Sequence, residues 1–593
     1  MEIKKRAEVA KSDQWDLSSL FASTQDWEKA LERLGDYIKE APSYKGKLTA
    51  GKQDFLDTFA WYEKVSILAE ALANWAMLNY SADASDSENV RRYSLISQAY
   101  SQLGASLSFF DPELLSIDDA TFDSYLKDND FKPYWVYLAK ERRFKAHVLS
   151  EKEERILALQ SESAQTSSLT FQDLTNVDFD FGRVGDKPLT QSTLASFLIN
   201  EDRNIRKEAY DQFYHVFESH QHTLARLYEG SVKQDIFSCT VRGFSSCRAK
   251  ALYPDNVEEQ VYDNLVETVH SGFDSLHRFY GLKRRLLHVD KLGHWDVYMP
   301  LVRGVTYKTN YEDAVDTVCK ALTPLGDDYV RTIKQGLTNE HWVDRYENKG
   351  KRSGAFSSGC FTGKPYIMLN FTGETLGDLF TMIHEGGHSM HSFYSKKSNP
   401  YFQYDYTIFE AEVASTFNEQ LLSHYLFNTA QDKQMRAYIL GKQLDDIVAT
   451  LFRQTMFAEY EDQVHKAAET GNPLTVDFLR EMYRKLLDSY FGPDVQFESF
   501  SDLEGLRIPH FYNAYYVYKY ATGISAAIAL SQRVLNGGEK EKQEYLSFLH
   551  SGGSHFPMDS LRLAGVDMSK GEAVKSAIQQ FTNLLNKFEA LVL

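Results

Sequence analysis

The sequence predicts a mostly α-helical protein built from at least two lobes. Only 13 of its 593 residues are prolines, and stretches such as Trp27–Leu34 and Glu153–Leu159 consist largely of residues with high helix propensity. A single hydrophobic core rarely serves more than about 250–300 residues, so a chain of this length is expected to divide. We place the division at Asn200–Arg203, which gives an N-terminal helical lobe, residues 1–200, and a second domain, residues 201–593.

The most informative motif is His384-Glu385-Gly386-Gly387-His388. Histidines four residues apart lie on one face of a helix, so both imidazoles can bind one metal ion. Zinc is the usual metal at such a pair, and the glutamate between them is placed to take a proton from an activated water molecule. Cobalt or manganese would fit the same types of ligand. A pattern of five residues also arises by chance, so its surroundings have to support it.

The residues around the motif favour a buried helix. Capping residues, Thr372 and Thr375, stand where such a helix would begin. Gly386 and Gly387 each cost a helix about 1 kcal/mol relative to alanine. The pair therefore predicts that a partner helix or the substrate approaches this backbone closely. The alternative is a loop in which the spacing of the histidines is incidental. Apolar residues precede the motif at i, i+3, i+4 and i+7, namely Leu376, Leu379, Phe380 and Ile383.

A second helix is expected to supply the third metal ligand. Catalytic zinc sites normally combine three protein ligands with one open position, and the segment Ile408–Glu419 has a helical composition. Glu412 lies in its apolar part, where an unpaired carboxylate would be costly, so we predict it as the third ligand. Glu419 and Asp378 are the two candidates for accepting the second N–H of a ligand histidine. We interpret His391 as a packed core histidine.

Two short strands are expected before the metal helix. They are Arg352–Cys360 and Pro365–Phe371, and the initial proline suggests that the second strand lies at a sheet edge. An extended peptide could pair with an exposed edge through backbone hydrogen bonds. The alternative is an ordinary hairpin that closes the core. Gly359, like Gly354, would allow a substrate backbone to approach closely. The candidate substrate contacts in this region are Gly354, Tyr366 and Asn370.

Taken together, these motifs resemble the oligoendopeptidase F branch of the thimet oligopeptidase family of zinc metallopeptidases. The resemblance rests on His384–His388, on Glu412–Ser415 and on the tyrosine-rich stretch Pro509–Gly523. Weaker similarity at Trp15–Leu17 and Trp295–Tyr298 extends it over essentially the whole chain. It implies one zinc ion per chain held by the two motif histidines and Glu412, with Glu385 as general base. It also implies a deep substrate channel between two helical lobes, which admits only short, unfolded peptides.

The tyrosine-rich stretch has a chemical interpretation of its own. The tetrahedral intermediate of peptide hydrolysis needs hydrogen-bond donors for its oxyanion, and tyrosine hydroxyls or a histidine can supply them. Tyr515 and Tyr518 are three residues apart and would share a helix face, with His510 just before the helix begins. The family resemblance makes these three residues the substrate and transition-state contacts, with Tyr512 as a further candidate. For any one of the chain's 36 tyrosines, simple packing is the alternative.

Composition constrains the partners and the setting. The formal charge is −18, from 83 acidic and 65 basic residues, which argues against a nucleic-acid or anionic-membrane partner. No secretory signal and no apolar stretch of about 20 residues is visible, so we expect a cytoplasmic protein. The four cysteines have no paired CxxC spacing, which argues against a cysteine-bound zinc site and suits reduced thiols. Nothing in the sequence sets the oligomeric state.

The sequence thus predicts a zinc-dependent endopeptidase that hydrolyses internal bonds of short peptides. Glu385 would remove a proton from the attacking water and later deliver it to the leaving amine. Two alternatives stay open. A carboxypeptidase or dipeptidyl carboxypeptidase of similar helical fold could use the same constellation. A zinc-containing peptide-binding protein without turnover is less consistent with Glu385, since a structural zinc site is normally closed by four ligands and needs no base.

Overall fold

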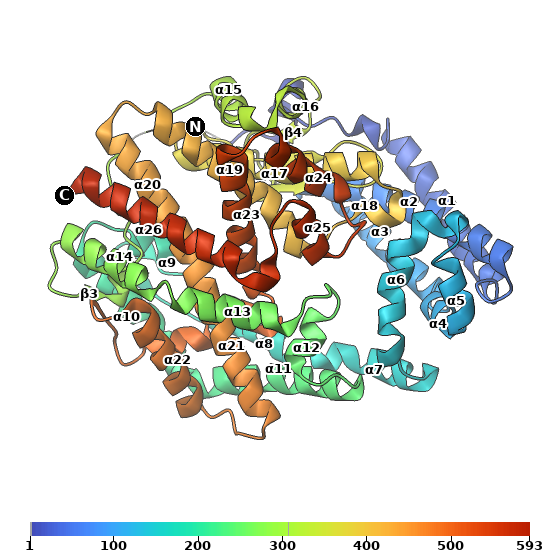
Figure 1. The fold of residues 1–593 in the computed structure, drawn as a ribbon, viewed down its shortest axis with the longest axis horizontal. Coiled ribbons are helices and arrows are strands. Elements are labelled where there is room, and N and C mark those ends of the chain that lie inside the picture. Colours follow the sequence, from blue (N-terminus) through green and yellow to red (C-terminus); the bar gives the residue numbers. More distant parts are fainter. Residues whose placement is uncertain (1–2, 306) are drawn as a thin grey trace. The chain divides into compact units, whose positions relative to one another are not determined.

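The computed structural model describes residues 3–305 and 307–593 and is mostly helical, as predicted (Figure 1). The segments that carried this prediction lie in α1, Thr24–Glu40, and α7, Glu151–Ala164. Among the described residues, no helix is both long and apolar enough to cross a membrane.

The chain forms two compact units, each assembled from three separate stretches. Unit 1 comprises Met1–Ala146, Thr306–Tyr425 and Leu530–Val566, and unit 2 comprises His147–Val305, Leu426–Ala529 and Asp567–Leu593. The compact units therefore do not follow the predicted single division at residue 200. Helix patterns are local in the sequence, whereas the grouping of helices depends on contacts between distant segments.

Unit 1 is built around long N-terminal helices and the helices of the metal motif. Trp27 of α1 is fully buried, stacks on Trp75 at 5.7 Å and donates its indole N–H to Leu72 O at 3.0 Å. This core joins α1, α2 and α3, which pack together (Figure 1). The helices of unit 1 besides α1 are α2 Lys52–Ala82, α3 Ser87–Ser106, α4 Phe110–Ser116, α5 Asp119–Tyr125, α6 Trp135–Arg143, α15 Tyr311–Ala321, α16 Asp327–Leu337, α17 Leu376–Ser398, α18 Tyr401–Tyr404, most of α19 Ile408–Thr429, α24 Glu539–Ser551 and α25 Pro557–Leu563.

Unit 1 also holds the predicted small sheet, with one strand more than expected. Its order is β4-β6-β5, where β4 is Val343–Asp344, β5 Phe356–Ser358 and β6 Tyr366–Met368. β6 pairs with β4 in parallel and with β5 antiparallel. The expectation that the second predicted strand forms an edge is therefore wrong, because β4 covers its other side. Among the described strands, β5 is the edge on the side of the metal helix.

Unit 2 is helical, with two small two-stranded sheets. β1 Arg183–Val184 pairs antiparallel with β2 Lys187–Pro188, and β3 Leu292–Gly293 pairs in parallel with β7 Val495–Gln496. The helices of unit 2 besides α7 are α8 Thr166–Asp173, α9 Gln191–Leu198, α10 Arg203–Ser219, α11 Gln221–Val241, α12 Cys247–Leu252, α13 Glu259–His270, α14 Phe273–Leu286, α20 Lys433–Ile447, α21 Arg453–Glu469, α22 Val476–Phe491, most of α23 Tyr518–Asn536, and α26 Glu572–Val592.

Candidate metal centre

The histidine motif lies in the middle of α17, as predicted, and the helix begins at a capping box. Thr375 is the N-cap residue, and its hydroxyl accepts from the backbone N–H of Asp378. The carboxylate of Asp378 accepts in return from the backbone N–H groups of Thr375 and Thr372 at 3.2 and 3.1 Å. Asp378 therefore closes the start of the helix, where a carboxylate also suits the positive end of the helix dipole. It does not serve as the predicted partner of a ligand histidine.

The glycine pair marks the point where α17 crosses α19, so the close neighbour is a helix. A Cβ atom added at Gly387 would lie 2.6 Å from the Cα of Ser415 and 2.7 Å from the carbonyl oxygen of Ala414. At Gly386 the nearest atom would be Cδ1 of the Ile333 side chain, at 2.9 Å. Glycine at position 387 thus lets the two backbones approach more closely than any side chain would permit.

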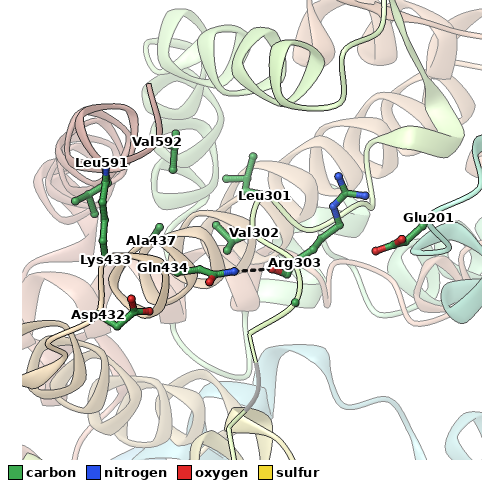
Figure 2. Close-up of a pocket in the computed structure, with 11 residues that line it drawn as sticks. Glu201, Leu301, Val302, Arg303, Asp432, Lys433, Gln434, Ala437, Leu591 and Val592 are labelled. Carbon is green, nitrogen blue, oxygen red and sulfur yellow. Dashed lines mark hydrogen bonds between the residues drawn. The ribbon is translucent and has the colours of Figure 1, made fainter.

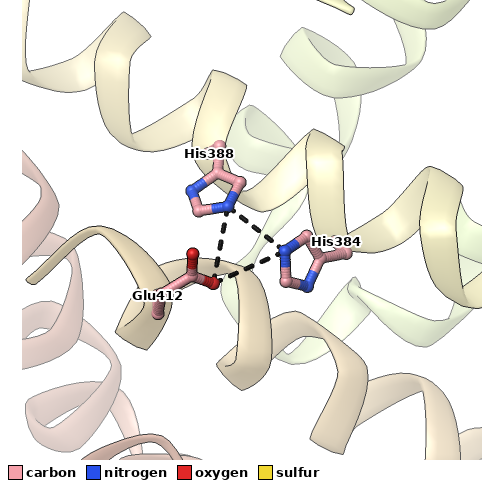
Figure 3. Close-up of side chains that lie close together, drawn as sticks. All are labelled: His384, His388 and Glu412. Carbon is pink, nitrogen blue, oxygen red and sulfur yellow. Dashed lines mark hydrogen bonds and ion pairs between the residues drawn. The ribbon is translucent and has the colours of Figure 1, made fainter. Parts of the chain in front are cut away.

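Three ligand atoms converge beside this crossing (Figure 3). The Nε2 atoms of His384 and His388 are 3.2 Å apart, and each points toward Oε2 of Glu412, at 3.5 and 3.7 Å. His384, His388 and Glu412 form the single group of potential metal ligands found among the described residues. The two histidines come from successive turns of α17, and Glu412 comes from the first turns of α19.

This arrangement fits a metal ion of the size of zinc. A point equidistant from the three ligand atoms lies about 2 Å from each of them, and zinc binds histidine nitrogen and carboxylate oxygen at about 2.0–2.2 Å. Two imidazole nitrogens and a carboxylate oxygen are all electron-pair donors, so their convergence on one point calls for a cation. Three protein ligands also leave the open position that a catalytic site requires.

Hydrogen bonding and burial place the ligand histidines in defined states. Nδ1–H of His384 donates to Oε1 of Glu419 at 2.7 Å, which fixes the tautomer and aims Nε2 at the centre. Burial would lower the pKa of His384, but the hydrogen bond and negative charge of Glu419 raise it to about 9. Burial lowers the pKa of His388 to about 3, so this ring is neutral. With a metal ion at Nε2, the hydrogen bond to Glu419 would keep the His384 proton on Nδ1.

Glu385 lies next to the three ligands in a cavity of about 500 Å³. Its side chain is nearly buried, and burial raises the pKa of its carboxyl group to about 7. A carboxyl group with this pKa can both accept and release a proton near neutral pH. The cavity is bounded on one side by the edge strand β5 and on the other by the start of α19.

The same cavity is lined by residues that the sequence analysis did not identify. Tyr404 and Tyr406 lie between the two metal-binding helices, and the Tyr406 hydroxyl is 2.9 Å from the hydroxyl of Ser392 on α17. The signal that could have identified them is the run of aromatic residues that begins at Tyr401. His391 is fully buried and stacks on Tyr406 at 3.6 Å, as expected for a packed core histidine.

The predicted substrate contacts on the sheet have mainly structural surroundings. Tyr366 is fully buried in the central strand, and its hydroxyl is 2.6 Å from that of Ser19. Asn370 donates from Nδ2 to the carbonyl oxygen of Gly354 at 2.8 Å and so ties down a turn. Gly354 itself has φ +82°, a conformation that favours glycine. The nearest neighbour of a Cβ at Gly359 would be Ser392 at 3.0 Å, so this close approach is also to α17. These surroundings leave the backbone of β5 as the sheet surface that faces the cavity.

The tyrosine-rich stretch belongs to unit 2, and its local structure differs from the prediction. Tyr515 has φ +58° and precedes α23, which begins at Tyr518, so the two residues do not share a helix face. Both side chains are buried, with Tyr518 packing against Tyr262 at 5.3 Å between ring centroids. Tyr512 stacks on Phe171 at 4.5 Å. His510, by contrast, is exposed.

A larger cavity, of about 770 Å³, lies elsewhere in unit 2 (Figure 2). Charged groups of both signs line it, including Glu201, Arg303, Asp432 and Lys433, and Gln434 donates to the carbonyl oxygen of Arg303 at 3.2 Å. The described residues in its lining include no histidine or cysteine. We therefore take the smaller cavity of Glu385, which contains the potential metal ligands, as the candidate site.

Comparisons with known proteins agree in pointing to one family. Residues 196–580 match peptidase family M3, and residues 113–181 match oligopeptidase F. The chain is 39% identical over 586 residues to an oligoendopeptidase F homolog of Borreliella burgdorferi, with 99% of each chain covered. A crystal structure of a protein from Chlamydophila abortus has 33% identity and a TM-score of 0.94, with both chains fully covered. Oligoendopeptidase F from Enterococcus faecium has 32% identity and a TM-score of 0.74, with 96% of this chain and 99% of that chain covered.

Proposed function

The chain belongs to peptidase family M3, and from this premise we propose that it is a zinc-dependent endopeptidase that hydrolyses internal bonds of short, unfolded peptides. The observation that carries the proposal is the convergence of His384, His388 and Glu412 on one point beside Glu385. A zinc ion bound there supplies Lewis acidity, which activates water and polarises the carbonyl of the cleaved bond.

Glu385 is the proposed general base and acid. Its carboxylate takes the proton of the attacking water and then returns it to the nitrogen of the leaving amine. Glu385 lines the same cavity as the three ligand residues, so one carboxyl group is placed for both proton transfers.

The proposed position of the substrate is the open edge of β5. A peptide in an extended conformation would pair with the backbone of Phe356–Ser358, which borders the cavity of Glu385. Backbone pairing does not depend on side chains, so it is compatible with substrates of many sequences. From the family resemblance, we further propose that His510 and Tyr518, together with Tyr515 and Tyr512, provide donors to the substrate or the oxyanion.

The proposed setting is the cytoplasm. The four cysteines are all free and buried, which suits a reducing compartment. Short peptides are the expected partners, and the net charge of −18 gives no support to binding of nucleic acid or an anionic membrane.

The decisive experiment follows cleavage of a mixed set of short peptides by mass spectrometry, with half of the peptides amidated at the C-terminus. We expect internal cuts in both halves, loss of cleavage with a chelator, and recovery when zinc is added. Trimming confined to free C-termini would instead identify a carboxypeptidase. No cleavage under any of these conditions would contradict a catalytic role.

A further inference from the structure

A second groove lies beside the metal centre within unit 1, between α2 and α3. Its volume is about 540 Å³. Helix α2 lines it with positions 70, 73, 74 and 77, and α3 with positions 93, 96, 97 and 100. Each set has the i, i+3, i+4, i+7 spacing of one helix face. The groove is therefore built from two facing helix surfaces along about two turns of each helix.

On the α3 side of this groove, the rings of Tyr93 and Tyr100 are partly exposed instead of packed in the core. Tyr93 and Tyr100 are 39% and 41% exposed, although both stand on the face of α3 that lines the groove. Tyr93 is held in place by stacking on Tyr80 at 4.9 Å and an interplanar angle of 8°. Tyr93 and Tyr100 are both partly exposed and lie on one face of α3. Together their rings provide a surface against which an apolar side chain can pack.

The groove and the cavity of Glu385 share part of their lining. Ser358 and Gly359 line both this groove and the cavity that contains Glu385. The hydroxyl of Ser358 donates to Oδ1 of Asn74 on α2 at 2.8 Å, which fixes the end of β5 against that helix. A peptide paired with β5 and extended beyond Gly359 would therefore enter the groove.

The acidic group in the groove is already engaged. One carboxylate oxygen of Glu70 accepts from the backbone N–H of Phe361 at 3.3 Å, and the other accepts from the hydroxyl of Tyr404. The described lining includes no lysine or arginine. The groove thus lacks a free charge to select a charged side chain, whereas its tyrosine rings, Met77 and Ile96 favour an apolar one.

We propose that the α2–α3 groove is a specificity subsite that binds an aromatic or large aliphatic side chain of the peptide, several residues away from the cleaved bond. The proposal rests on the proposed function, since it assumes that the peptide lies along β5. It predicts that the enzyme distinguishes peptides by a residue remote from the bond that it cuts.

A matched pair of serines on α3 allows a direct test. Ser97 lines the groove, whereas Ser94, one turn earlier, does not. Both are exposed, and both hydroxyls donate to a carbonyl oxygen of their own helix, at 2.8 and 2.9 Å. Ser97→Trp should fill the groove, and Ser94→Trp is the control for placing the same bulky side chain on α3.

The assay measures kcat/KM for one core peptide and for versions extended by one to four residues on either side, ending in phenylalanine or alanine. For the wild type we expect phenylalanine to exceed alanine by at least about tenfold at one particular position, since burying an aromatic side chain is worth that much or more. Ser97→Trp should reduce this ratio toward one, and Ser94→Trp should retain it. Tyr100→Ala, which removes a wall without filling the groove, should reduce it several-fold.

Each result bears on the proposal. The absence of a positional preference in the wild type would overturn it, as would a preference that survives Ser97→Trp. Thermal unfolding shows whether Ser97→Trp is folded. If it is not, the test is the ratio of kcat/KM for the phenylalanine and alanine peptides in Tyr100→Ala, and an unchanged ratio would overturn the proposal. A wild-type enzyme that cuts none of the peptides would contradict the proposed function itself, whereas cleavage without remote preference would contradict the subsite alone.

Discussion

Replacing Gly387 by alanine should weaken metal binding more than it weakens the fold. The added Cβ would lie 2.6 Å from Cα of Ser415, a backbone atom that cannot rotate away. Carbon atoms in contact are normally about 3.5–4.0 Å apart, so α17 and α19 would have to separate by about 1 Å. Glu412 stands three residues before Ser415 on the same helix and would move with it. Zinc–ligand distances tolerate only about 0.2 Å of change.

The effect on stability should be modest because two terms oppose each other. Alanine is favoured over glycine within a helix by about 1 kcal/mol, whereas overpacking costs about 1–3 kcal/mol. The net loss is then at most about 2 kcal/mol. Metal affinity and peptide cleavage should both fall by about 100-fold, since a displacement of about 1 Å in a catalytic group has effects of that order.

Two further glycines provide a graded control series. Gly35 in α1 has no atom within 4 Å of an added Cβ, so Gly35→Ala should stabilise the protein slightly and leave zinc affinity unchanged. At Gly386 the obstacle is the end of the Ile333 side chain, which can move, so Gly386→Ala should have an intermediate effect. Zinc titration against a competing chelator and thermal unfolding measure the two quantities. A Gly387→Ala protein that binds zinc as tightly as Gly35→Ala would refute the reasoning.

Four further outcomes are expected. Glu385→Gln should keep its zinc but lose at least about 100-fold in peptide cleavage, because the amide cannot accept a proton; an active variant with normal zinc would contradict the assignment. Glu412→Gln should lower zinc content after dialysis, and an unchanged content would place the third ligand elsewhere. Glu419→Gln should lower zinc affinity by about 10–100-fold in the chelator titration, since it weakens the partner of Nδ1 of His384. Burial would raise the pKa of Glu504 in unit 2, but Arg453, which donates to both carboxylate oxygens, lowers it to about 2. Because this folded-state pKa is below the ordinary 4.5, its stabilisation is present above pH 4.5 and is lost as the pH falls toward 2. Urea unfolding across this range should reveal a loss on the order of 3 kcal/mol, and Glu504→Gln should unfold with a weaker pH dependence.

The metal-binding face could be predicted because its information is local. The spacing of His384 and His388 and the apolar periodicity before them fix one face of α17, and the glycine pair indicates a close neighbour. Glu412 and Glu419, seven residues apart, likewise share a face of α19. The sequence did not separate Glu419 from Asp378, because both are acidic and near the motif. In the structure Glu419 accepts from His384, and Asp378 caps the start of α17.

Features that depend on pairing between distant segments, or on a rare backbone conformation, could not be predicted in the same way. The edge of the sheet was misassigned because β4, Val343–Asp344, is a strand of two residues with almost no pattern in the sequence. Tyr515 was placed in a helix because tyrosine with φ +58° is uncommon and carries no sequence signal. The two compact units cross the predicted division at residue 200 because tertiary contacts, and not local propensity, group the helices.

The metal site and the contact between α17 and α19 are formed by the same short segments of the two helices. On α19, Glu412, Ser415 and Glu419 stand at i, i+3 and i+7, and they serve as ligand, contact point and hydrogen-bond partner. On α17, Gly387 immediately precedes His388 and lies at the point of contact with α19. The distance between the helices therefore sets the distance from the two histidines to Glu412, so a residue that never touches the metal can control its affinity. Substitutions along this contact should change metal binding in proportion to the separation they impose, whatever their effect on overall stability.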